Sequence, residues 1–181
     1  MATYADLMQV PDNMVAELVD GELVTSRRAG PQTHAASVVG FLLGPPFDFG
    51  RGGPGGWWIL FQPELHLAEN VLVPDFVGWR RERMPEIPQD HVFSIVPDWI
   101  CEVTSPSSGR LDRLKKMPIY AHSGVEFAWL LDPAQQTLES YERQDDRWVL
   151  LGTFGDEPLA RIRPFEAIEI DLTRIFGALP S

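Results

Sequence analysis

The amino-acid sequence predicts an α/β (α+β) protein with a mixed sheet flanked by helices, and three observations support this. An Asp-Gly turn divides residues 17–24 into two short strands, which is the strongest local signal of a β-hairpin. The nearly continuous apolar run at 99–103 is typical of a central strand covered on both faces. A helix over 110–122 and a strand over 126–131 follow it, and this order implies a parallel crossover.

The N-terminal half is expected to contain two helical segments besides the hairpin. Residues 4–16 predict a short helix and a loop, and residues 31–43 predict an amphipathic helix that begins at Pro31. Gly44-Pro45-Pro46 is expected to end this helix, because the next stretch, 44–56, holds six Gly and three Pro and predicts a loop. This loop lacks the Gly-Lys-Ser/Thr ending of a phosphate-binding loop, so a nucleotide cradle is not expected.

The remaining elements are predicted strands, with one last helical turn. Residues 57–68 and 71–79 are rich in β-branched and aromatic side chains and predict an antiparallel pair joined at Glu69-Asn70, followed by an exposed connection at 80–89. The later strands are expected at 137–143, 148–154 and 168–170, before a helical turn at 171–176. With no internal repeat, the chain predicts a single domain over residues 1–181.

Composition limits the classes of function. The chain has 15 Lys and Arg against 26 Asp and Glu, a net charge of −11, which disfavours binding to nucleic acid through overall positive charge. It has no run of 18 apolar residues and no leader-like N-terminus, and its single cysteine, Cys101, cannot form an internal disulfide. We therefore expect a soluble, cytoplasmic protein with no membrane partner.

One local basic patch departs from this acidic background. Arg110, Arg113, Lys115 and Lys116 lie within seven residues of one predicted helix. The patch is either a nucleic-acid contact or an ordinary solvated helix face, and these two interpretations stay open here.

Two carboxylates stand inside otherwise apolar strands. Asp75 lies in the segment 71–77, where residues two apart share a face, and Glu102 lies in the segment 98–104. An ionised side chain there is costly unless a cation, a donor or water meets it. If the two strands are neighbours, both acids converge on one hard cation, which prefers oxygen ligands. The alternatives are a carboxylate bonded to backbone amides for Asp75 and a metal-free ion pair with Lys116 for Glu102.

The helix that follows Glu102 adds a third component. Asp112, Lys116 and Tyr120 are spaced i, i+4 and i+8, so they lie on one helix face, and Lys116 is the candidate cation there. The four histidines, in contrast, have no metal-ligand spacing with one another.

Together these residues resemble a known family. The pattern consists of Pro74-Asp75, Glu102-Val103-Thr104-Ser105-Pro106, Asp112-x-x-x-Lys116-x-x-x-Tyr120 and Gly124-Val125-x-x-x-Trp129-Leu130-x-Asp132-Pro133. It is similar to the Uma-type family of proposed restriction endonucleases, formerly a domain of unknown function, within the PD-(D/E)xK nuclease superfamily. The hairpin at 17–24 and the helix that holds His34 also match the opening of this family, so the resemblance covers most of the chain.

The resemblance implies a restriction-endonuclease-like core with an N-terminal β-hairpin and phosphodiester hydrolysis dependent on Mg²⁺ or Mn²⁺. Asp75 and Glu102 match the metal-binding acids of the motif, with the Val103 carbonyl as a backbone ligand. The motif lysine belongs at position 104, where this chain has Thr104. A lysine on the following helix is the proposed substitute in the family, and this assigns Lys116 to orienting the attacking water.

The resemblance also implies auxiliary residues and partners. Glu17 or Glu22 supplies a further acid, and His34, Asp112 and Tyr120 are auxiliary candidates. The expected partner is nucleic acid, taken as DNA with RNA still open, and the basic patch supplies Arg110, Arg113 and Lys115 as candidate contacts to it. A homodimer is expected because superfamily nucleases often pair to cut both strands.

A second class of function stays open. It is a catalytically inactive module of the same fold that acts as a homodimeric partner-binding protein, which the charge of −11 and the missing lysine at Thr104 favour.

Overall fold

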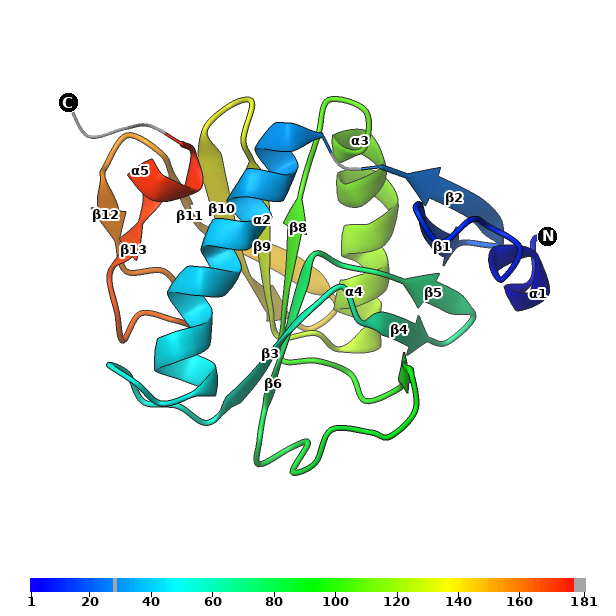
Figure 1. Ribbon diagram of the computed structural model, residues 1–181, viewed down its shortest axis with the longest axis horizontal. Helices are drawn as coiled ribbons and strands as arrows, with labels where there is room; N and C mark the ends of the chain where they lie inside the picture. The colour runs from blue at the N-terminus through cyan, green and yellow to red at the C-terminus, as the bar shows by residue number, and fades with distance from the viewer. Residues whose placement is uncertain (28, 178–181) are drawn as a thin grey trace.

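The computed structural model describes residues 1–27 and 29–177, which form an α/β structure with mixed sheets and few helices (Figure 1). The helices are α1 (Tyr4–Leu7), α2 (Gly30–Leu43), α3 (Gly109–Leu111), α4 (Met117–Ser123) and α5 (Leu172–Ile175), with π-helical turns η1 (Gly44–Asp48) and η2 (Asp112–Lys116). The strands are β1 (Val15–Val19), β2 (Glu22–Ser26), β3 (Trp57–Phe61), β4 (Glu64–Leu67), β5 (Asn70–Leu72), β6 (Phe76–Arg80), β7 (Val92–Phe93), β8 (Trp99–Val103), β9 (Phe127–Asp132), β10 (Thr137–Gln144), β11 (Arg147–Phe154), β12 (Leu159–Ala160) and β13 (Ile170–Asp171). None of the helices in these ranges is long and apolar enough to cross a membrane.

A six-stranded sheet, in the order β11-β10-β9-β8-β6-β3, forms the centre of the molecule. Its strands pair antiparallel except for β8 and β9, which are parallel and are connected through α3, η2 and α4. This confirms the predicted crossover. The connection places the carboxyl end of β8 directly before the helix that carries Lys116.

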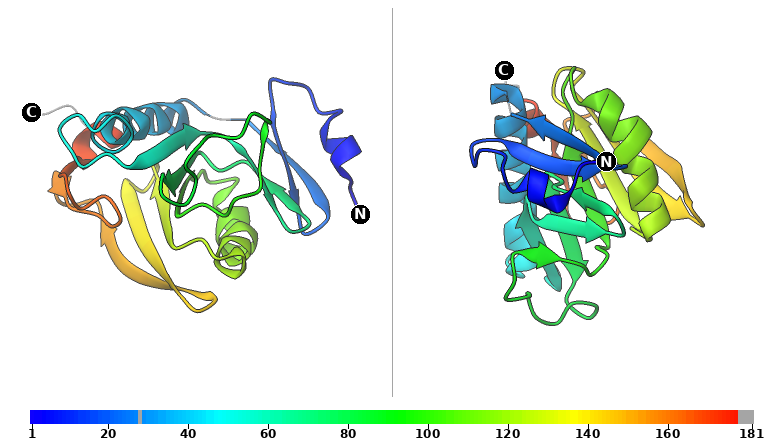
Figure 2. Two further views of the ribbon diagram at one scale, coloured as in Figure 1. Left: turned by 90° about the horizontal axis from the view of Figure 1, so that it is seen from below. Right: turned by 90° about the vertical axis from the view of Figure 1, so that its right-hand side faces the viewer.

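A second mixed sheet, in the order β2-β1-β5-β4-β7, lies beside the first (Figure 1). It begins with the predicted hairpin of β1 and β2, where Asp20 and Gly21 both have positive φ, 51° and 77°. Such a two-residue turn matches the twist of its strands. The hairpin forms one end of this second sheet, on the side of the six-stranded sheet that α4 covers (Figure 2).

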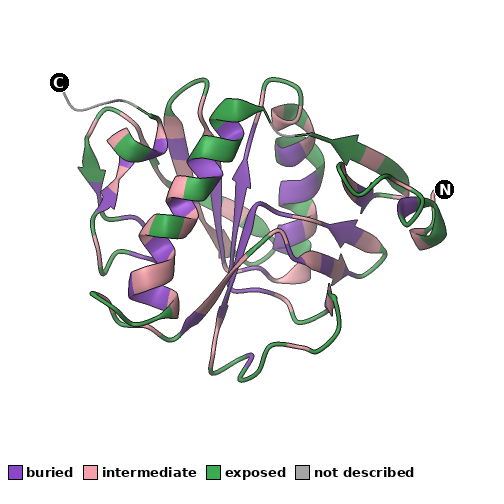
Figure 3. Cartoon of the chain, viewed as in Figure 1, coloured by how far each residue is buried: buried purple, intermediate pink, exposed green. Residues whose placement is uncertain are grey.

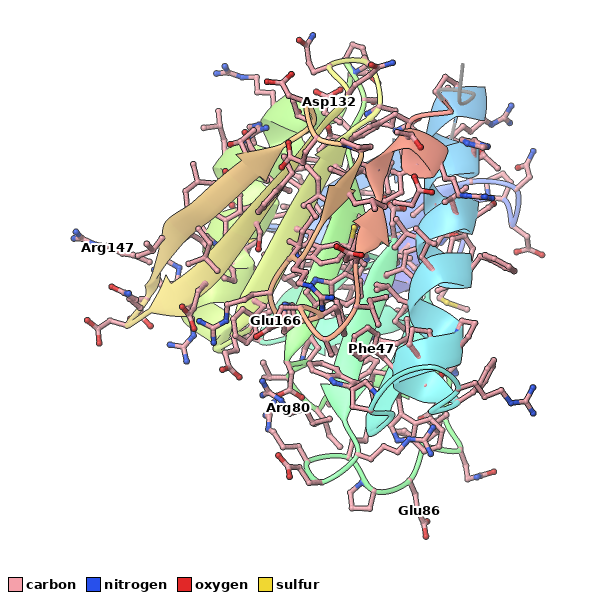
Figure 4. The ribbon with its side chains drawn as sticks, turned by 90° about the vertical axis from the view of Figure 1, so that its left-hand side faces the viewer. Phe47, Arg80, Glu86, Asp132, Arg147 and Glu166 are labelled. Atoms are coloured by element: carbon pink, nitrogen blue, oxygen red, sulfur yellow. The ribbon has the colours of Figure 1, made fainter. Side chains whose placement is uncertain are left out.

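The two faces of the six-stranded sheet are covered by different helices (Figure 2). Along β8, Trp99, Cys101 and Val103 pack into the cluster that contains the buried residues of α2 and α5, whereas Ile100 packs into a second cluster with α4, β4 and β5. Figure 4 shows side chains filling the space between α2 and the sheet, with Phe47 at the end of that helix. Because successive side chains of β8 point to opposite faces of the sheet, this strand contributes to two separate buried clusters.

The strands predicted over 57–68 and 71–79 pair antiparallel, as expected, but each segment forms two separate strands and not one continuous strand. β3 pairs with β6 in the six-stranded sheet, while β4 pairs with β5 in the second sheet. The breaks fall beside Pro63 and Pro74, which lack an N–H to donate to a sheet ladder. Asp75 consequently lies in the break immediately before β6, and not inside a continuous strand as the sequence pattern predicted.

Two further expectations about connections need correction. The helix does not end at Gly44 but continues as η1, which carries the buried Phe47 into the core. The connection at 80–89 begins in β6, and its Met84 is fully buried although the other residues of that stretch suggest exposure. Figure 3 shows how the buried positions concentrate on the central strands while the outer side of α2 is exposed.

Candidate functional site

A cavity of about 310 Å³ lies where β1, β8, η2 and the break before β6 meet. Four carboxylates line it, and all four residues are buried: Glu17, Asp75, Glu102 and Asp112. Among the described residues, the basic side chains in its lining are the buried Lys116 and the exposed Arg27. Asp75 and Glu102, distant in sequence, therefore reach the same cavity as Lys116.

Lys116 is the centre of the charged cluster. Its Nζ lies 2.7 Å from Glu17 Oε1, 2.7 Å from Glu102 Oε1 and 3.8 Å from Asp112 Oδ1, and its side chain is 3% exposed. An ammonium group has three N–H donors, and the distance to Asp112 is too long for a hydrogen bond. Counting only partners within 1–27 and 29–177, Lys116 thus uses two donors on glutamates, which leaves one for another acceptor.

The π-helical turn η2 explains how Lys116 reaches this position. Pro118 has no N–H for the carbonyl of residue 114, so a regular α-helical bond cannot form there. The helix widens over Asp112–Lys116 and then continues as α4 to Gly124, whose φ of 97° ends it. Turns of this kind occur frequently at functional sites.

Glu17 and Glu102 are each held by a second donor. The N–H of Val73 donates to Glu17 Oε1 at 2.7 Å, and the hydroxyl of Tyr120 donates to Glu102 Oε1 at 2.5 Å. Both contacts of Glu102 fall on Oε1, and among the described residues none is found on Oε2. Glu102 therefore keeps one carboxylate oxygen as an acceptor on the cavity.

Asp75 is tied to the end of β8. Its Oδ2 accepts the backbone N–H of Val103, while the carbonyl of Val103 accepts a hydrogen bond from Gln32 Nε2 at 3.2 Å. The Asp75 carbonyl in turn accepts the N–H of Gln62 at 3.1 Å. These bonds hold the carboxylate of Asp75 and the carbonyl of Val103 side by side at the cavity.

The electrostatics of the cluster shift several pKa values. Burial, with the nearby charges of Asp112 and Glu17, raises the pKa of Glu102 to about 8, although Lys116 opposes this. Burial also raises the pKa of Asp112. Glu102, Glu17 and Asp112 together raise the pKa of Lys116, outweighing the opposite effect of its burial. Lys116 therefore stays charged, while the excess of negative charge favours uptake of a proton or a cation.

The residues of the cavity fit Mg²⁺, which needs few protein ligands, better than a metal ion that is held by three or more side chains. No three His, Cys, Asp or Glu side chains within 1–27 and 29–177 are arranged to hold a metal ion. Mg²⁺, however, is commonly bound by one or two carboxylates and keeps several waters. Asp75, Glu102 and the Val103 carbonyl supply two carboxylates and one backbone oxygen beside unbalanced negative charge, which matches that preference.

The structure separates the auxiliary candidates. Glu17, Asp112 and Tyr120 join the cluster around Lys116. Glu22 is exposed on β2 and is not part of the cavity lining. His34 is exposed on α2, and its Nε2 lies 3.0 Å from the Arg174 carbonyl, so it contacts α5 and not the cavity.

Of the basic patch, Lys116 is buried in the cluster, whereas Arg110, Arg113 and Lys115 are exposed, and two of these three already have acidic neighbours. Arg113 Nη1 lies 2.6 Å from Glu139 Oε2, and Lys115 Nζ lies 3.2 Å from Asp20 Oδ2. Arg110 is exposed six residues before Lys116. The patch therefore consists partly of surface ion pairs, which contribute little to stability.

Thr104 supplies no cation in place of the motif lysine. It is buried, its N–H donates to the Leu131 carbonyl at 2.7 Å, and its hydroxyl donates to the same oxygen at 3.3 Å. The residue extends the pairing of β8 with β9.

Sequence reasoning missed Gln32, Gln62 and Arg27, which all line the cavity. For Gln32 a signal existed, because it begins the stripe of α2 that continues with the buried Ala35, Ala36 and Val39. A polar residue at the start of an apolar stripe indicates a buried polar contact. Gln62 and Arg27 stand in connecting segments, whose placement depends on the fold.

Comparisons with known proteins agree with this geometry. The model of the family Uma2, described as "Putative restriction endonuclease", matches residues 1–173. The fold is similar to a crystal structure described as "a putative nuclease belonging to DUF820 from Anabaena variabilis ATCC 29413", with a TM-score of 0.73, 20% sequence identity, and coverage of 98% of this chain and 99% of that chain. No curated protein matches the sequence.

Proposed function

This chain belongs to the Uma2 family, and we propose that it is a Mg²⁺-dependent endonuclease that hydrolyses phosphodiester bonds of nucleic acid, with DNA as the preferred substrate. The observation that carries the proposal is the buried cluster itself. Four carboxylates share one cavity with a single buried ammonium group. A protein that needed only stability would be served as well by apolar side chains there, because a buried ion pair is weak evidence for stability.

In this proposal the six-stranded sheet with α2 and α4 is a restriction-endonuclease-like core. Asp75, Glu102 and the Val103 carbonyl hold the ion, and Gln32 keeps that carbonyl in place through its hydrogen bond. A bound divalent ion supplies a Lewis acid, which stabilises charge on a phosphate and lowers the pKa of a coordinated water.

The other residues orient the reactants. Lys116 uses its third N–H donor to hold the attacking water or a phosphate oxygen, while Glu17 and Glu102 fix the position of its Nζ. Tyr120 holds Glu102 in position through a hydrogen bond from its hydroxyl. Arg110, Arg113 and Lys115 contact the phosphate backbone, Arg113 and Lys115 by exchanging their carboxylate partners for phosphates, which makes binding dependent on salt.

Cleavage of single- and double-stranded DNA and of RNA with Mg²⁺ or Mn²⁺ tests the proposal. Asp75→Asn, Glu102→Gln and Lys116→Ala are each expected to lower the rate by roughly 10³-fold, as for loss of several kcal/mol of transition-state stabilisation. Arg147→Ala, which changes an exposed basic residue of β11 outside both the cavity lining and the basic patch, is the control. Equal activity in all variants would assign the cleavage to a contaminant or another site.

An inactive, homodimeric partner-binding module is the second candidate function. It is favoured by β11, which ends the six-stranded sheet and exposes Val149, Leu150 and Leu151 in succession. An exposed apolar edge strand is suited to pairing with another chain. A stable dimer by light scattering, together with no cleavage under any metal condition, would favour this function over the nuclease.

A further inference from the structure

A second cavity adjoins the candidate active site. It has a volume of about 600 Å³, within the range of small-ligand pockets of about 300–1,000 Å³. The two cavities have part of their walls in common, formed by Val15, Ser26, Arg27, Gln62 and Val73. The second cavity therefore lies next to the carboxylate cluster, on the other side of these residues.

The wall of the second cavity combines polar and apolar surface in nearly equal parts, and more of its charged groups are acidic than basic. Its apolar side comes from the N-terminal segment, with Leu7, Met8, Val10, Pro11 and Met14. The polar groups include Asp12, Asn13 and Glu64, and Arg27 at the junction is the one basic residue among the lining positions that the structure describes. This wall suits a flat, uncharged ring with polar edges and repels phosphate. A nucleobase has that chemistry, and carboxylates accept hydrogen bonds from its amino groups.

Gln62 at the junction has an unusual backbone. Its φ is 49°, a left-handed conformation that favours glycine, and its N–H is fixed by the Asp75 carbonyl. The other positive-φ residues besides glycine, Asp20, Ala68, Gln136 and Asp145, all lie in turns between paired antiparallel strands. Gln62 instead connects β3 to β4, which belong to different sheets. A strained position beside a site, occupied by a long amide side chain, indicates that the side chain has a role.

We propose that the second cavity binds the base of a nucleotide next to the scissile phosphate, and that Gln62 and Arg27 hold the phosphate linkage between the two cavities. The base must leave its stack to enter, which costs least in an unpaired strand. The preferred substrate is thus single-stranded DNA or a single-stranded flank. This inference rests on the proposed nuclease function and specifies its substrate.

Binding of a short fluorescent single-stranded oligodeoxynucleotide, measured by anisotropy with Ca²⁺ in place of Mg²⁺, tests the inference without requiring cleavage. Gln62→Gly is expected to weaken binding roughly tenfold or more, as for loss of one hydrogen bond to a charged phosphate. The matched control is Gln136→Gly, which removes the same side chain at the same backbone conformation in the turn between β9 and β10. Both variants should have an unchanged or higher Tm because glycine adopts positive φ without strain.

An abasic scan locates the base that enters the cavity. One abasic position in the oligonucleotide should weaken binding by wild type about fivefold or more, and should cost less in Met8→Ser, which removes an exposed part of the cavity wall. Leu159→Ser, at an exposed apolar residue of β12, is the control. If wild type binds and cleaves but every abasic position and Gln62→Gly are neutral, the inference is wrong and the nuclease function stands. If wild type neither binds nor cleaves, both are overturned.

Discussion

The two faces of β8 show how one strand serves two purposes. Trp99, Cys101 and Val103 face an apolar cluster under α2, where Phe165 contacts the rings of Trp99 and Trp129 at centroid distances of 4.8 Å and 5.5 Å. Glu102, on the opposite face, is equally buried but lies against Lys116. The apolar face stabilises the fold by removing surface from water, whereas the charged face keeps groups buried at an energetic cost. That cost is the physical sign of a site.

The largest effect is expected where the charged face loses its cation. Lys116→Met should lower the free energy of unfolding by about 3–5 kcal/mol at neutral pH, because Glu17 and Glu102 remain buried and lose their cation, keeping only the neutral donors of Val73 and Tyr120. Urea denaturation measures the change. Combining Lys116→Met with Glu17→Gln and Glu102→Gln should recover part of the lost stability. A Lys116→Met protein as stable as wild type would contradict the contrast between the two faces of β8.

The second effect is a dependence of stability on pH. The pKa of Glu102 is raised from 4.5 to about 8, so its contribution to stability is fully present below about pH 4.5 and is lost as the pH rises through about 8. The Tm advantage of wild type over Glu102→Gln should therefore shrink between pH 5 and pH 8. Asp112, whose pKa is also raised, acts in the same direction.

Mg²⁺ should offset this loss at high pH. Saturation at about a hundredfold excess over Kd adds about 2.7 kcal/mol to the folded state, and chelation should remove it. Calorimetric melting with Mg²⁺ and with EDTA measures the difference, with Asp75→Asn as the variant that should not respond. A wild-type Tm insensitive to Mg²⁺ at pH 8 would argue against metal binding at the cluster.

A substitution in the apolar cluster should lower stability by an amount that does not depend on pH or on Mg²⁺. Phe165→Leu is expected to lower the free energy of unfolding by roughly 1–2 kcal/mol, because a smaller side chain leaves the aromatic rings around it less well packed. The loss should be the same at pH 5 and pH 8 and with or without Mg²⁺. A strong dependence on pH or on the ion would mean that the two faces are coupled.

The smallest effect is expected at the lysine next to Lys116. Lys115→Gln removes an exposed ion pair with Asp20 and should change the free energy of unfolding by about 0–1 kcal/mol. If Lys115 also contacts phosphate, the variant should bind DNA with a weaker dependence on salt concentration. Titrations at several salt concentrations, with Asp20→Asn as the control for the ion pair alone, separate these roles.

The sequence predicted the elements that depend on local chemistry. The Asp20-Gly21 turn, the buried strand at 99–103 and the crossover to 127–132 all appear in the structure, because their signals lie in adjacent residues. Continuity across Pro63 and Pro74 was predicted wrongly, since strand composition on both sides conceals where a sheet changes partners.

The candidate site divides in the same way. Asp75, Glu102, Asp112, Lys116 and Tyr120 were recognisable from spacing and from the cost of charge among apolar neighbours. The choice of Glu17 over Glu22 was open, because both flank the same turn and either could face inward. Only the packing of β1 against the rest of the molecule turned Glu17 toward Lys116.

By itself, the sequence determined the class of fold and the residue types available for the site, because alternation, turn chemistry and helix periodicity act over a few residues; the family followed from the resemblance of its motifs. Tertiary structure decided which of those residues meet. It brought Asp75 from a chain break to the end of β8, placed Gln32 on the Val103 carbonyl, and opened the second cavity beside Gln62. Such contacts join residues far apart in the chain, and their geometry depends on how whole sheets and helices pack.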